Sequence, residues 1–555
     1  MMFSNKNRHE MINKLKKNQF DVLIIGGGIT GAGIAFDASS RGMKTALVEM
    51  QDFASGTSSR STKLVHGGLR YLKNLEVKLV AEVGKERAVV YENGPHVTTP
   101  EWMLLPIYKG GTFGRISTSI GLRAYDYLAG VKREERRRML NAQETAGKVP
   151  LIKKEGLQGA GYYVEYRTDD ARLTIEVLKA AYEKGAVPIN YTKAYKLLYN
   201  NNEVAGVMAV DQLTGEEYEI KAHTIVNASG PWVDFIRDLD GSKKGKTMQL
   251  TKGVHVVFDQ SKLPLEQAVY FDTPDNRMIF AIPRNGKTYV GTTDTFYNHD
   301  PKNPKITMKD RDYLIHAIND MFPDAEVRET DIESSWAGVR PLISVEGKDP
   351  SEISRKDEIW EAPSGLITIA GGKLTGYRKM AETVVNLLAR KLIAKNNKYF
   401  LSCMTRALPI SGGDVGGSRN YKAFIEGLSR VGIEIGLTQD EAFHLVSMYG
   451  SNAPILFKMI ETDSSNKAEK YEMPITLWVK LKYALEYEMA STPSDFFIRR
   501  TGDLLFDIHS VRKYRKQVHY YMSEYFGWSE KRKQQFIMEL EQELNDATTP
   551  DKLYE

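Results

Sequence analysis

The stretch FDVLIIGGGITGAGIAFDASSRGMKTALVEM, residues 20–50, decides the fold of this chain. Its apolar start predicts a buried β-strand that runs directly into a G-x-G-x-x-G turn made by Gly26, Gly28 and Gly31. The first glycine allows the tight turn, the second lets the backbone approach a pyrophosphate, and the third lets the next helix pack against the strand. The first N–H groups of that helix and its dipole then face the phosphates.

A second short strand, residues 45–48, follows the helix and ends at Glu49. An acidic residue about 20 positions after the glycines is placed to accept hydrogen bonds from a ribose hydroxyl. A lone G-x-G-x-x-G is a weak signal. Strand, turn, helix, strand and acid in this order predict an α/β domain that binds a dinucleotide.

Composition narrows the class of protein. The 555 residues are too many for one core, so several domains are expected. Cys403 is the only cysteine, which excludes an internal disulfide and a cysteine-cluster metal site and fits a reducing cytoplasm. No H-E-x-x-H or other coherent ligand spacing occurs, so no metal is expected. A net charge of +5 is too modest for this length to indicate nucleic-acid binding. No apolar run reaches the ~18 residues that cross a bilayer, and the basic start lacks the apolar segment of a secretory signal.

Several elements can be predicted from their ends. Asp169 caps a helix that Gly185 ends, and Asn285-Gly286 between two apolar runs is a hairpin signature. From about residue 401 the chain is expected to be helical, with a capping box at Thr438 and Glu441. The expected strands are residues 194–198, 204–210, 217–221, 224–230, 278–282, 288–290 and 366–370.

Six motifs follow one another along the chain: GGGITGAGIAFDASSRG, SSRSTKLVHGGLRYL, NASGPWV, GTTD, GVRPL and GGKLTGYRKMAE. Together they closely resemble the FAD-dependent glycerol-3-phosphate dehydrogenases of bacteria, which belong to the glycine-oxidase/D-amino-acid-oxidase-like flavoproteins. The resemblance covers about residues 21–393, and RRTGDLLF at residues 499–506 resembles the C-terminal cap domain of those enzymes.

The resemblance implies an α/β fold in which a Rossmann-like FAD-binding domain is interleaved with an antiparallel β-sheet substrate domain, followed by an α-helical cap. The parts expected of the FAD-binding domain are residues 18–95, 161–245 and 346–400. Those of the substrate domain are residues 96–160 and 246–345, and the cap is residues 401–555.

The implied reaction is oxidation of sn-glycerol 3-phosphate to dihydroxyacetone phosphate in glycerol catabolism, by hydride transfer from C2 to N5 of FAD. Binding this small dianion requires several cations, and the planar fork of arginine matches phosphate oxygens. The resemblance suggests that Arg277 and Arg340 bind the phosphate. It places Arg70, Tyr71 and Lys373 near the substrate hydroxyls and the flavin.

A base must accept the proton of the C2 hydroxyl, and histidine suits this role because its ordinary pKa lies near neutrality. Alternation along residues 252–258 puts His255 on the face opposite Val254 and Val256. If the valines face core, His255 can face a cavity; it could equally be an ordinary exposed strand residue. The resemblance favours His255 as the base, with His66 beside the flavin ring. A cation such as Arg340 or Lys373 near the alkoxide would ease deprotonation.

The remaining expectations concern the cofactor. Ser58, Ser59 and Thr62 are expected near the pyrophosphate; without the resemblance they would read as a polar loop. The residues expected to contact FAD are Gly26, Gly28, Ile29, Thr30, Gly31, Glu49, Thr57, Ser58, Ser59, Lys63, His66, Gly67, Gly68, Ala228, Gly230, Gly372, Lys373, Leu374 and Thr375.

Three alternatives stay open. A glycerol-3-phosphate oxidase shares the half-reaction but uses dioxygen, and the insertion that such oxidases tend to carry is not recognised here. A non-catalytic, flavin-bound interaction protein would keep its flavin oxidised when glycerol 3-phosphate is added without air. A NAD(P)-dependent dehydrogenase would lack the yellow colour of flavin.

The acceptor that the resemblance implies is the membrane quinone pool. Peripheral contact with the cytoplasmic face of the cell membrane is therefore expected. The candidate attachment sites are the basic runs at residues 14–17 and 512–516, although such runs are more often plain solvated charge. A homodimer is compatible with the sequence, which does not give the oligomeric state.

Overall fold

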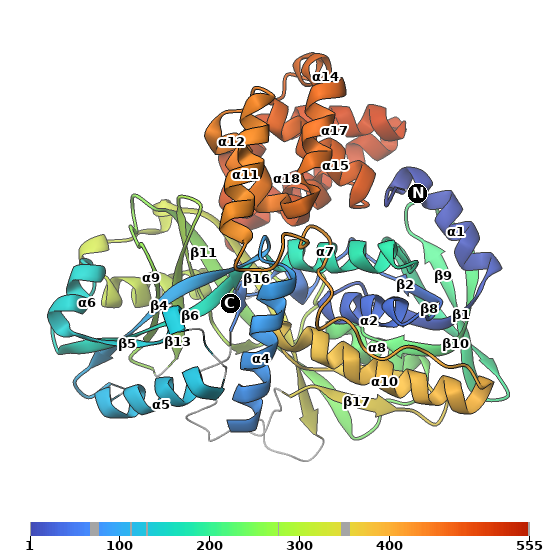
Figure 1. The fold of residues 1–555 in the computed structure, drawn as a ribbon, viewed down its shortest axis with the longest axis horizontal. Helices are drawn as coiled ribbons and strands as arrows, with labels where there is room; N and C mark the ends of the chain where they lie inside the picture. The colour runs from blue at the N-terminus through green and yellow to red at the C-terminus, as the bar shows by residue number, and fades with distance from the viewer. Residues whose placement is uncertain are drawn as a thin grey trace.

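The computed structural model describes residues 2–66, 77–111, 114–128, 131, 133–275, 277–345 and 356–552. Three parts can be followed in Figure 1: an α/β layer at the lower right, a large sheet at the lower left and a helical domain above both. In the described part of the chain no helix is long and apolar enough to span a bilayer.

The first sheet carries the glycine turn. Its parallel centre is β1 (Gln19–Ile25), which pairs with β2 (Thr45–Val48) on one side and β10 (Glu217–Asn227) on the other. Helix α2 (Ile29–Ser40) follows the turn, and almost all of its residues are buried because α7 and α10 pack against it. The other elements of this part are α1 (Arg8–Lys17), α4 (Val77–Asn93), α7 (Asp170–Glu183), β7 (Val187–Ile189), β8 (Thr192–Asn200), β9 (Glu203–Asp211), α8 (Val233–Leu239), β17 (Glu358–Glu361), β18 (Ile367–Ala370) and α10 (Tyr377–Asn396).

One continuous strand stands where the sequence predicts two. β10 runs unbroken through residues 217–227; its first half pairs antiparallel with β9 and its second half parallel with β1 and β18. Burial alternates along the first half and becomes continuous in the second. The apparent break in the sequence is therefore the point where the strand passes from a half-covered to a fully covered position.

The second sheet is built around a long antiparallel ribbon of β11 (Lys246–Asp259) and β16 (Ile332–Val345). The predicted hairpin is confirmed: β13 (Met278–Arg284) and β14 (Lys287–Gly291) are joined by Asn285 and Gly286, whose φ angles of 50° and 75° are those a tight hairpin turn requires. The other elements are β3 (Leu64–Val65), β4 (Thr98–Tyr108), α5 (Arg115–Leu128), β5 (Arg138–Asn141), α6 (Ala142–Lys148), β6 (Leu157–Thr168), β12 (Ala268–Asp272), β15 (Thr295–Phe296) and α9 (Met308–Met321).

The predicted domain boundary after residue 160 falls inside β6, which pairs with β4 as far as Thr168. The second sheet therefore extends further along the chain than that boundary. The other boundaries remain predictions.

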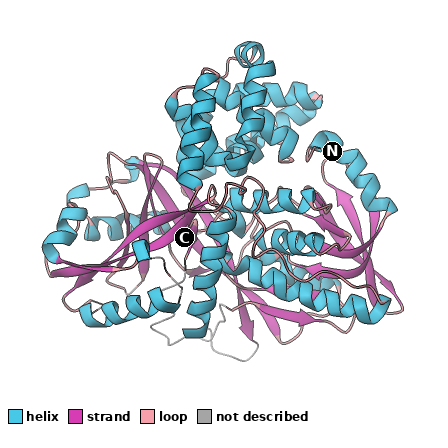
Figure 2. Cartoon of the chain, viewed as in Figure 1, coloured by secondary structure: helices cyan, strands magenta, loops and turns pink. Residues whose placement is uncertain are grey.

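The C-terminal part is helical, as Figure 2 shows. Its helices are α11 (Tyr421–Glu434), α12 (Gln439–Tyr449), α13 (Ala453–Met459), α14 (Ser465–Lys470), α15 (Ile475–Tyr487), α16 (Asp503–Phe506), α17 (Ile508–Phe526) and α18 (Glu530–Thr548). The capping box at Thr438 and Glu441 is present. Helix was expected from residue 401, but residues 401–420 are irregular and lie along the α/β layer, because Pro409 and a set of glycines interrupt any helix there.

The predicted fold class is confirmed by this arrangement: an α/β dinucleotide unit interleaved with a largely antiparallel sheet, followed by a helical domain.

Candidate functional site

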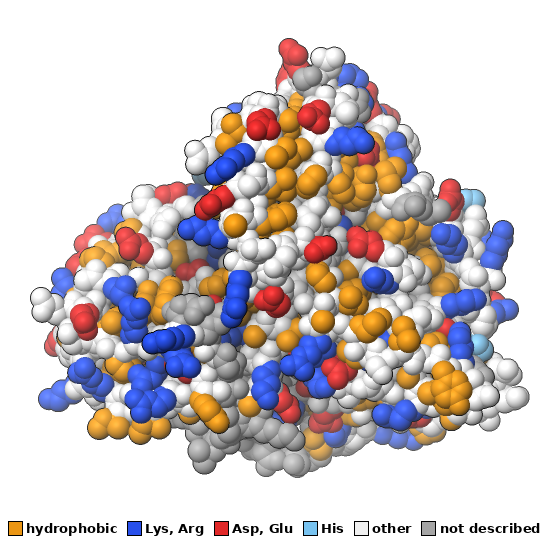
Figure 3. All heavy atoms as spheres, in the orientation of Figure 1, with side chains coloured by type: hydrophobic (Ala, Val, Ile, Leu, Met, Phe, Trp, Pro, Cys, Tyr) orange, Lys and Arg blue, Asp and Glu red, His pale blue; other side chains and the backbone are white. Residues whose placement is uncertain are grey.

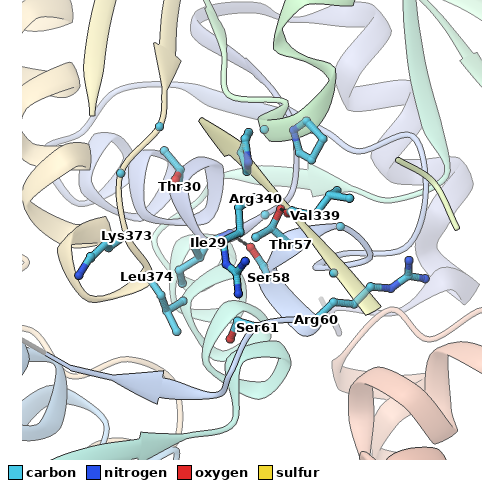
Figure 4. Close-up of a pocket in the computed structure, with 18 of the residues that line it drawn as sticks. Ile29, Thr30, Thr57, Ser58, Arg60, Ser61, Val339, Arg340, Lys373 and Leu374 are labelled. Carbon is cyan, nitrogen blue, oxygen red and sulfur yellow. Dashed lines mark hydrogen bonds between the residues drawn. The ribbon is translucent and has the colours of Figure 1, made fainter. Parts of the chain in front are cut away.

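A cavity of about 530 Å³ lies where the carboxyl ends of the first sheet meet the β11–β16 ribbon (Figure 4). This is the edge at which open α/β sheets bind their ligands. The glycine turn, the loop after β2, the end of β18 and residues 371–375 after it line the cavity from the first sheet, and β11, β13 and β16 line it from the second.

The glycine turn is a tightly built corner. Gly26 has a φ of 117°, and a Cβ on it would lie 2.5 Å from the carbonyl oxygen of Ala228. A Cβ on Gly31 would overlap the carbonyl oxygen of Gly26. The backbone N–H of Ile29, at the start of α2, donates to Ser58 Oγ (3.0 Å). The turn therefore presents backbone and a hydroxyl, rather than side-chain bulk, to the cavity.

Glu49 closes the cavity beside this turn. Its Oε2 accepts from the N–H of Gly27 (2.7 Å), and its Oε1 accepts from the N–H of Gln51 (2.8 Å). Burial raises the pKa of this carboxyl, while the two backbone donors act in the opposite direction. The carboxylate is thus fixed in place, and each oxygen retains capacity for a further donor.

The opposite wall is one face of the β11–β16 ribbon. Opposite pairs on this face are Gly253 with Gly338 and His255 with Trp336. A Cβ on Gly253 would overlap the guanidinium of Arg340, and one on Gly338 would overlap the backbone carbonyl of Arg60. Gly253 therefore makes the room in which the guanidinium of Arg340 lies across the ribbon, and Gly338 lets the backbone of Arg60 approach.

Arg340 is held by the segment after β14. Its guanidinium donates to Thr292 Oγ1 (2.8 Å), to the carbonyl of Thr293 (3.1 Å) and to Asp294 Oδ1 (3.2 Å). It lies on the cavity wall and is about one third exposed, with a side-chain exposed fraction of 31%. This geometry aims a fixed planar cation into the cavity.

His255 lies flat against Trp336, with ring centroids 4.6 Å apart and planes 10° apart. Its Nε2 is 3.1 Å from Thr62 Oγ1. Val254 and Val256 point into the hydrophobic core on the other side of the strand, so the alternation inferred from the sequence is present. Burial, with the positive charges of Arg340 and Lys63, holds the pKa of His255 well below its usual value. The imidazole is therefore neutral at neutral pH and can accept a proton.

His66 lies at the other side of the cavity. Its ring meets the edge of Phe280 (5.9 Å between centroids), and its backbone carbonyl accepts from Thr375 Oγ1 (3.2 Å). Burial lowers the pKa of His66 to about 3, helped by the charges of Lys373 and Arg87. In Figure 4 the side chain of Lys373 points away from Arg340.

Most of the residues predicted for the site line this one cavity. They are Gly26, Gly28, Ile29, Thr30, Glu49, Thr57, Ser58, His66, Ala228, Gly230, His255, Arg277, Arg340, Gly372, Lys373, Leu374 and Thr375. Arg277 contributes from the rim, where its guanidinium pairs with Asp275 (3.2 Å) and lies over the ring of Tyr313.

Three predicted contacts lie behind the cavity wall instead. Gly31 supports the turn, Ser59 is buried, and Lys63 pairs with Asp170 (2.6 Å). Gly67, Gly68, Arg70 and Tyr71 lie outside the described residues.

Sequence reasoning missed some of the residues that line the cavity. Thr62, expected near the pyrophosphate, also lines it, and its hydroxyl lies 3.1 Å from Nε2 of His255. Arg60, Gly253 and Thr292 also line the cavity and were not predicted. Gly253 carried a usable signal, since an isolated glycine within a strand marks a close approach. Among the described residues no cluster of three or more His, Cys, Asp or Glu is placed to hold a metal.

Comparison with known proteins gives consistent matches along the whole chain. The family model for FAD dependent oxidoreductases matches residues 21–378, and the model for the C-terminal domain of alpha-glycerophosphate oxidase matches residues 403–533. The aerobic glycerol-3-phosphate dehydrogenase of Bacillus subtilis is 60% identical over 99% of both chains.

Solved structures agree with these matches. The glycerol-3-phosphate dehydrogenase of Bacillus halodurans, solved in complex with FAD, superposes with a TM-score of 0.86 at 48% identity and covers 100% of both chains. The L-alpha-glycerophosphate oxidase of Mycoplasma pneumoniae superposes with a TM-score of 0.55 at 18% identity, covering 70% of this chain and 97% of that one, which shows a shared fold alone.

Proposed function

Because the chain belongs to the family of FAD-dependent glycerol-3-phosphate dehydrogenases, we propose that it oxidises sn-glycerol 3-phosphate to dihydroxyacetone phosphate and delivers the electrons to a membrane quinone. The observation that carries the proposal is the single cavity that joins the glycine turn to His255 and Arg340. A dinucleotide cradle, a neutral base and a fixed planar cation are the three groups that this reaction requires.

FAD is the cofactor, and the cavity wall fits it. The turn at Gly26–Gly28 has no side chains in the way of a pyrophosphate, and the N-terminus of α2 faces that point. We assign Glu49 to the adenosine ribose, and the segment from Gly372 to Thr375 to the flavin end. When bound there, FAD supplies the acceptor for the hydride from C2 of the substrate.

The chain's own residues supply binding and proton transfer. Arg340 binds the phosphate through two N–H groups, and Arg277 adds a second positive charge at the rim. His255 accepts the proton of the C2 hydroxyl, since its depressed pKa leaves the imidazole neutral. Thr62 orients this ring. The charge of Arg340 beside His255 also favours an alkoxide over a hydroxyl in the cavity.

Anaerobic titration of the flavin absorbance with glycerol 3-phosphate tests this assignment. Wild-type protein should be bleached. Arg340→Ala should need about 10- to 100-fold more substrate, because a charged hydrogen-bond pair is lost. His255→Ala should slow bleaching by about 100-fold or more at saturating substrate. Arg311→Ala, an arginine of α9 outside the cavity, is the matched control and should behave as wild type. Absence of bleaching in the wild type would contradict the proposal.

The electron acceptor needs a separate measurement. The family name does not distinguish quinone from dioxygen, so hydrogen peroxide yield should be compared with reduction of a quinone analogue under the same conditions. Quinone reduction with little peroxide supports the dehydrogenase. Stoichiometric peroxide would instead identify a glycerol-3-phosphate oxidase.

A quinone lies in lipid, and α5 offers the surface best suited to reach it. Ile116, Ile120 and Tyr127 fall on one stripe of this helix and are 78%, 65% and 86% exposed. Exposed arginines lie on this helix and in the segment that follows it: Arg115, Arg123, Arg133, Arg136 and Arg138. Figure 3 shows Lys and Arg side chains gathered at the lower left over α5, with hydrophobic atoms along the lower edge. An apolar stripe flanked by arginines suits an anionic membrane surface.

The two basic runs predicted for this role are placed less favourably. In α1 the apolar side chains of Met11, Ile12 and Leu15 are buried against the first sheet, so only the polar face remains outside. In α17, Arg515 pairs with Glu541 of α18. The exposed residues of this second run are Arg512, Lys513 and Lys516, so neither run presents an exposed apolar stripe that could enter a bilayer.

Sedimentation with phosphatidylglycerol vesicles at low salt tests the α5 surface. Wild-type protein should bind and be released by high salt, whereas the double variant Ile116→Ser, Ile120→Ser should stay in solution. Ile433→Ser, an exposed isoleucine of α11, is the control. Equal binding by both variants would rule out α5 as the attachment surface.

A further inference from the structure

A buried ionic cluster joins the helical domain to the loop that follows β2. Asp52 of that loop is 1% exposed and Arg500 of the helical domain is fully buried. Arg500 donates to both carboxylate oxygens of Asp52, through Nη1 (2.7 Å) and Nη2 (2.9 Å). Arg499 donates to Asp52 from Nε (2.6 Å) and to Asp495 from Nη2 (2.6 Å). Two arginines from one domain thus converge on a single carboxylate of the other.

Two backbone carbonyls of the helical domain also hold this cluster in place. Arg500 also donates to the backbone carbonyl of Glu488, from Nε (3.0 Å) and Nη2 (2.8 Å). Asn190, which follows β7, donates to both Asp52 (2.9 Å) and the carbonyl of Met489 (3.0 Å). Buried charges with this many partners have little freedom to move.

The loop that carries Asp52 holds the glycine turn from two sides. Glu49 Oε2 accepts from the N–H of Gly27, and the carbonyl of Gly27 accepts from the N–H of Ala54 (3.1 Å). Between them, the carbonyl of Asp52 accepts from Ser55 Oγ (2.7 Å). Ala54 adopts a φ of 63°, a left-handed conformation that needs support from its surroundings. Arg499 and Arg500 of the helical domain are placed to give that support, because both bind Asp52.

We propose that the helical domain sets the affinity for FAD, with Arg499 and Arg500 as positioning residues that hold the Glu49–Ser55 loop against the glycine turn through Asp52. The connection runs from Arg500 to Asp52, along the loop to Glu49, and so to the adenosine end of the cofactor. It rests on the proposed assignment of Glu49 to the ribose. Asp52, Arg499 and Arg500 do not line the cavity themselves.

The dissociation constant of FAD tests the proposal. It is measured from the flavin fluorescence as FAD is added back to protein from which the cofactor has been removed. Asp52→Asn keeps the shape of the side chain but leaves two buried arginines without their shared anion. It should weaken FAD binding by about ten-fold or more. Glu488→Gln is the matched control: it removes an equally buried carboxylate, paired with Arg172 at the same junction, but keeps the backbone carbonyl that Arg500 uses.

A merely structural role predicts a different pattern. Both variants would then lower the melting temperature of the apoprotein without a selective change in FAD affinity. If Asp52→Asn binds FAD as tightly as wild type, the proposal is overturned. If Asp52→Asn does not fold, Arg499→Lys is measured in the same way, because it keeps the positive charge but loses one of the two donors. Unchanged FAD affinity in Arg499→Lys would then overturn the proposal.

The variant Glu49→Gln distinguishes the proposed role of the helical domain from the assignment of Glu49 to the ribose. Weaker FAD binding in Glu49→Gln but not in Asp52→Asn would overturn the role of the cap and leave the ribose assignment intact. Unchanged binding in both would overturn the ribose assignment as well.

Discussion

Thr62 holds the imidazole of His255 through the 3.1 Å contact between its hydroxyl and Nε2, while Nδ1 has no hydrogen-bond partner among the described residues. Thr62→Val keeps the volume and removes the hydroxyl, so we expect flavin reduction by glycerol 3-phosphate to slow by about ten-fold. Thr62→Ser should stay close to wild type. The check is the rate of anaerobic bleaching across a pH series. A wild-type profile in Thr62→Val would mean that stacking on Trp336 alone orients the ring.

At the same scale, sequence reasoning could name residue types but not their orientations. Arg340 was predicted because it lies in GVRPL, one of the motifs that carry the family resemblance, and it does line the cavity. Lys63 was predicted from its motif too, yet it turns inward to Asp170. Composition does not reveal which way a loop residue points, because that depends on partners distant in the sequence.

At the scale of helices and strands, the β1–turn–α2 unit requires a residue without a Cβ at position 31. A Cβ on Gly31 would overlap the carbonyl oxygen of Gly26, so Gly31→Ala should force α2 away from β1 and abolish FAD retention. Gly427→Ala in α11, where a Cβ meets nothing within 4 Å, should instead stabilise the protein by roughly 0.5–1 kcal/mol. Flavin content after purification and the melting temperature distinguish the two. A flavin-loaded Gly31→Ala protein would contradict the packing argument.

Short sequence patterns predicted individual helices and turns well. They did not predict which distant strands pair with each other. The capping box at Thr438 and the Asn285-Gly286 turn were correct because their physics is confined to a few residues. The pairing of β4 with β6, and the parallel contact between β4 and β12, bring together strands far apart in the chain. No local pattern encodes such partners, so the second sheet could be predicted as antiparallel but not assembled.

For the whole molecule, buried neutral histidines make stability depend on pH. Burial lowers the pKa of His96 to about 3, and that of His66 likewise, whereas an unfolded histidine titrates near 6.5. The unfolded state therefore binds more protons below about pH 6.5, so stability is present above that pH and is lost as the pH falls. Between pH 7.5 and 5, His96→Gln should lose about 2 kcal/mol less unfolding free energy than wild type. Urea unfolding at both pH values measures this; equal losses would show that His96 is not held neutral.

The β11–β16 ribbon has a consequence for substrate choice. Arg340 lies opposite Thr251, and His255 lies four residues further along β11, so both groups belong to one hydrogen-bonded ladder. That separation, roughly 13 Å of strand before the side chains reach inward, cannot stretch with movements of the helical domain. The sheet therefore fixes the distance between these two side chains, and that distance can select substrates by their length. With the phosphate on Arg340 and the hydroxyl proton passing to His255, as we propose, a three-carbon phosphate ester would place its middle hydroxyl at the imidazole, and a longer polyol phosphate held by the same arginine would present a different carbon for oxidation.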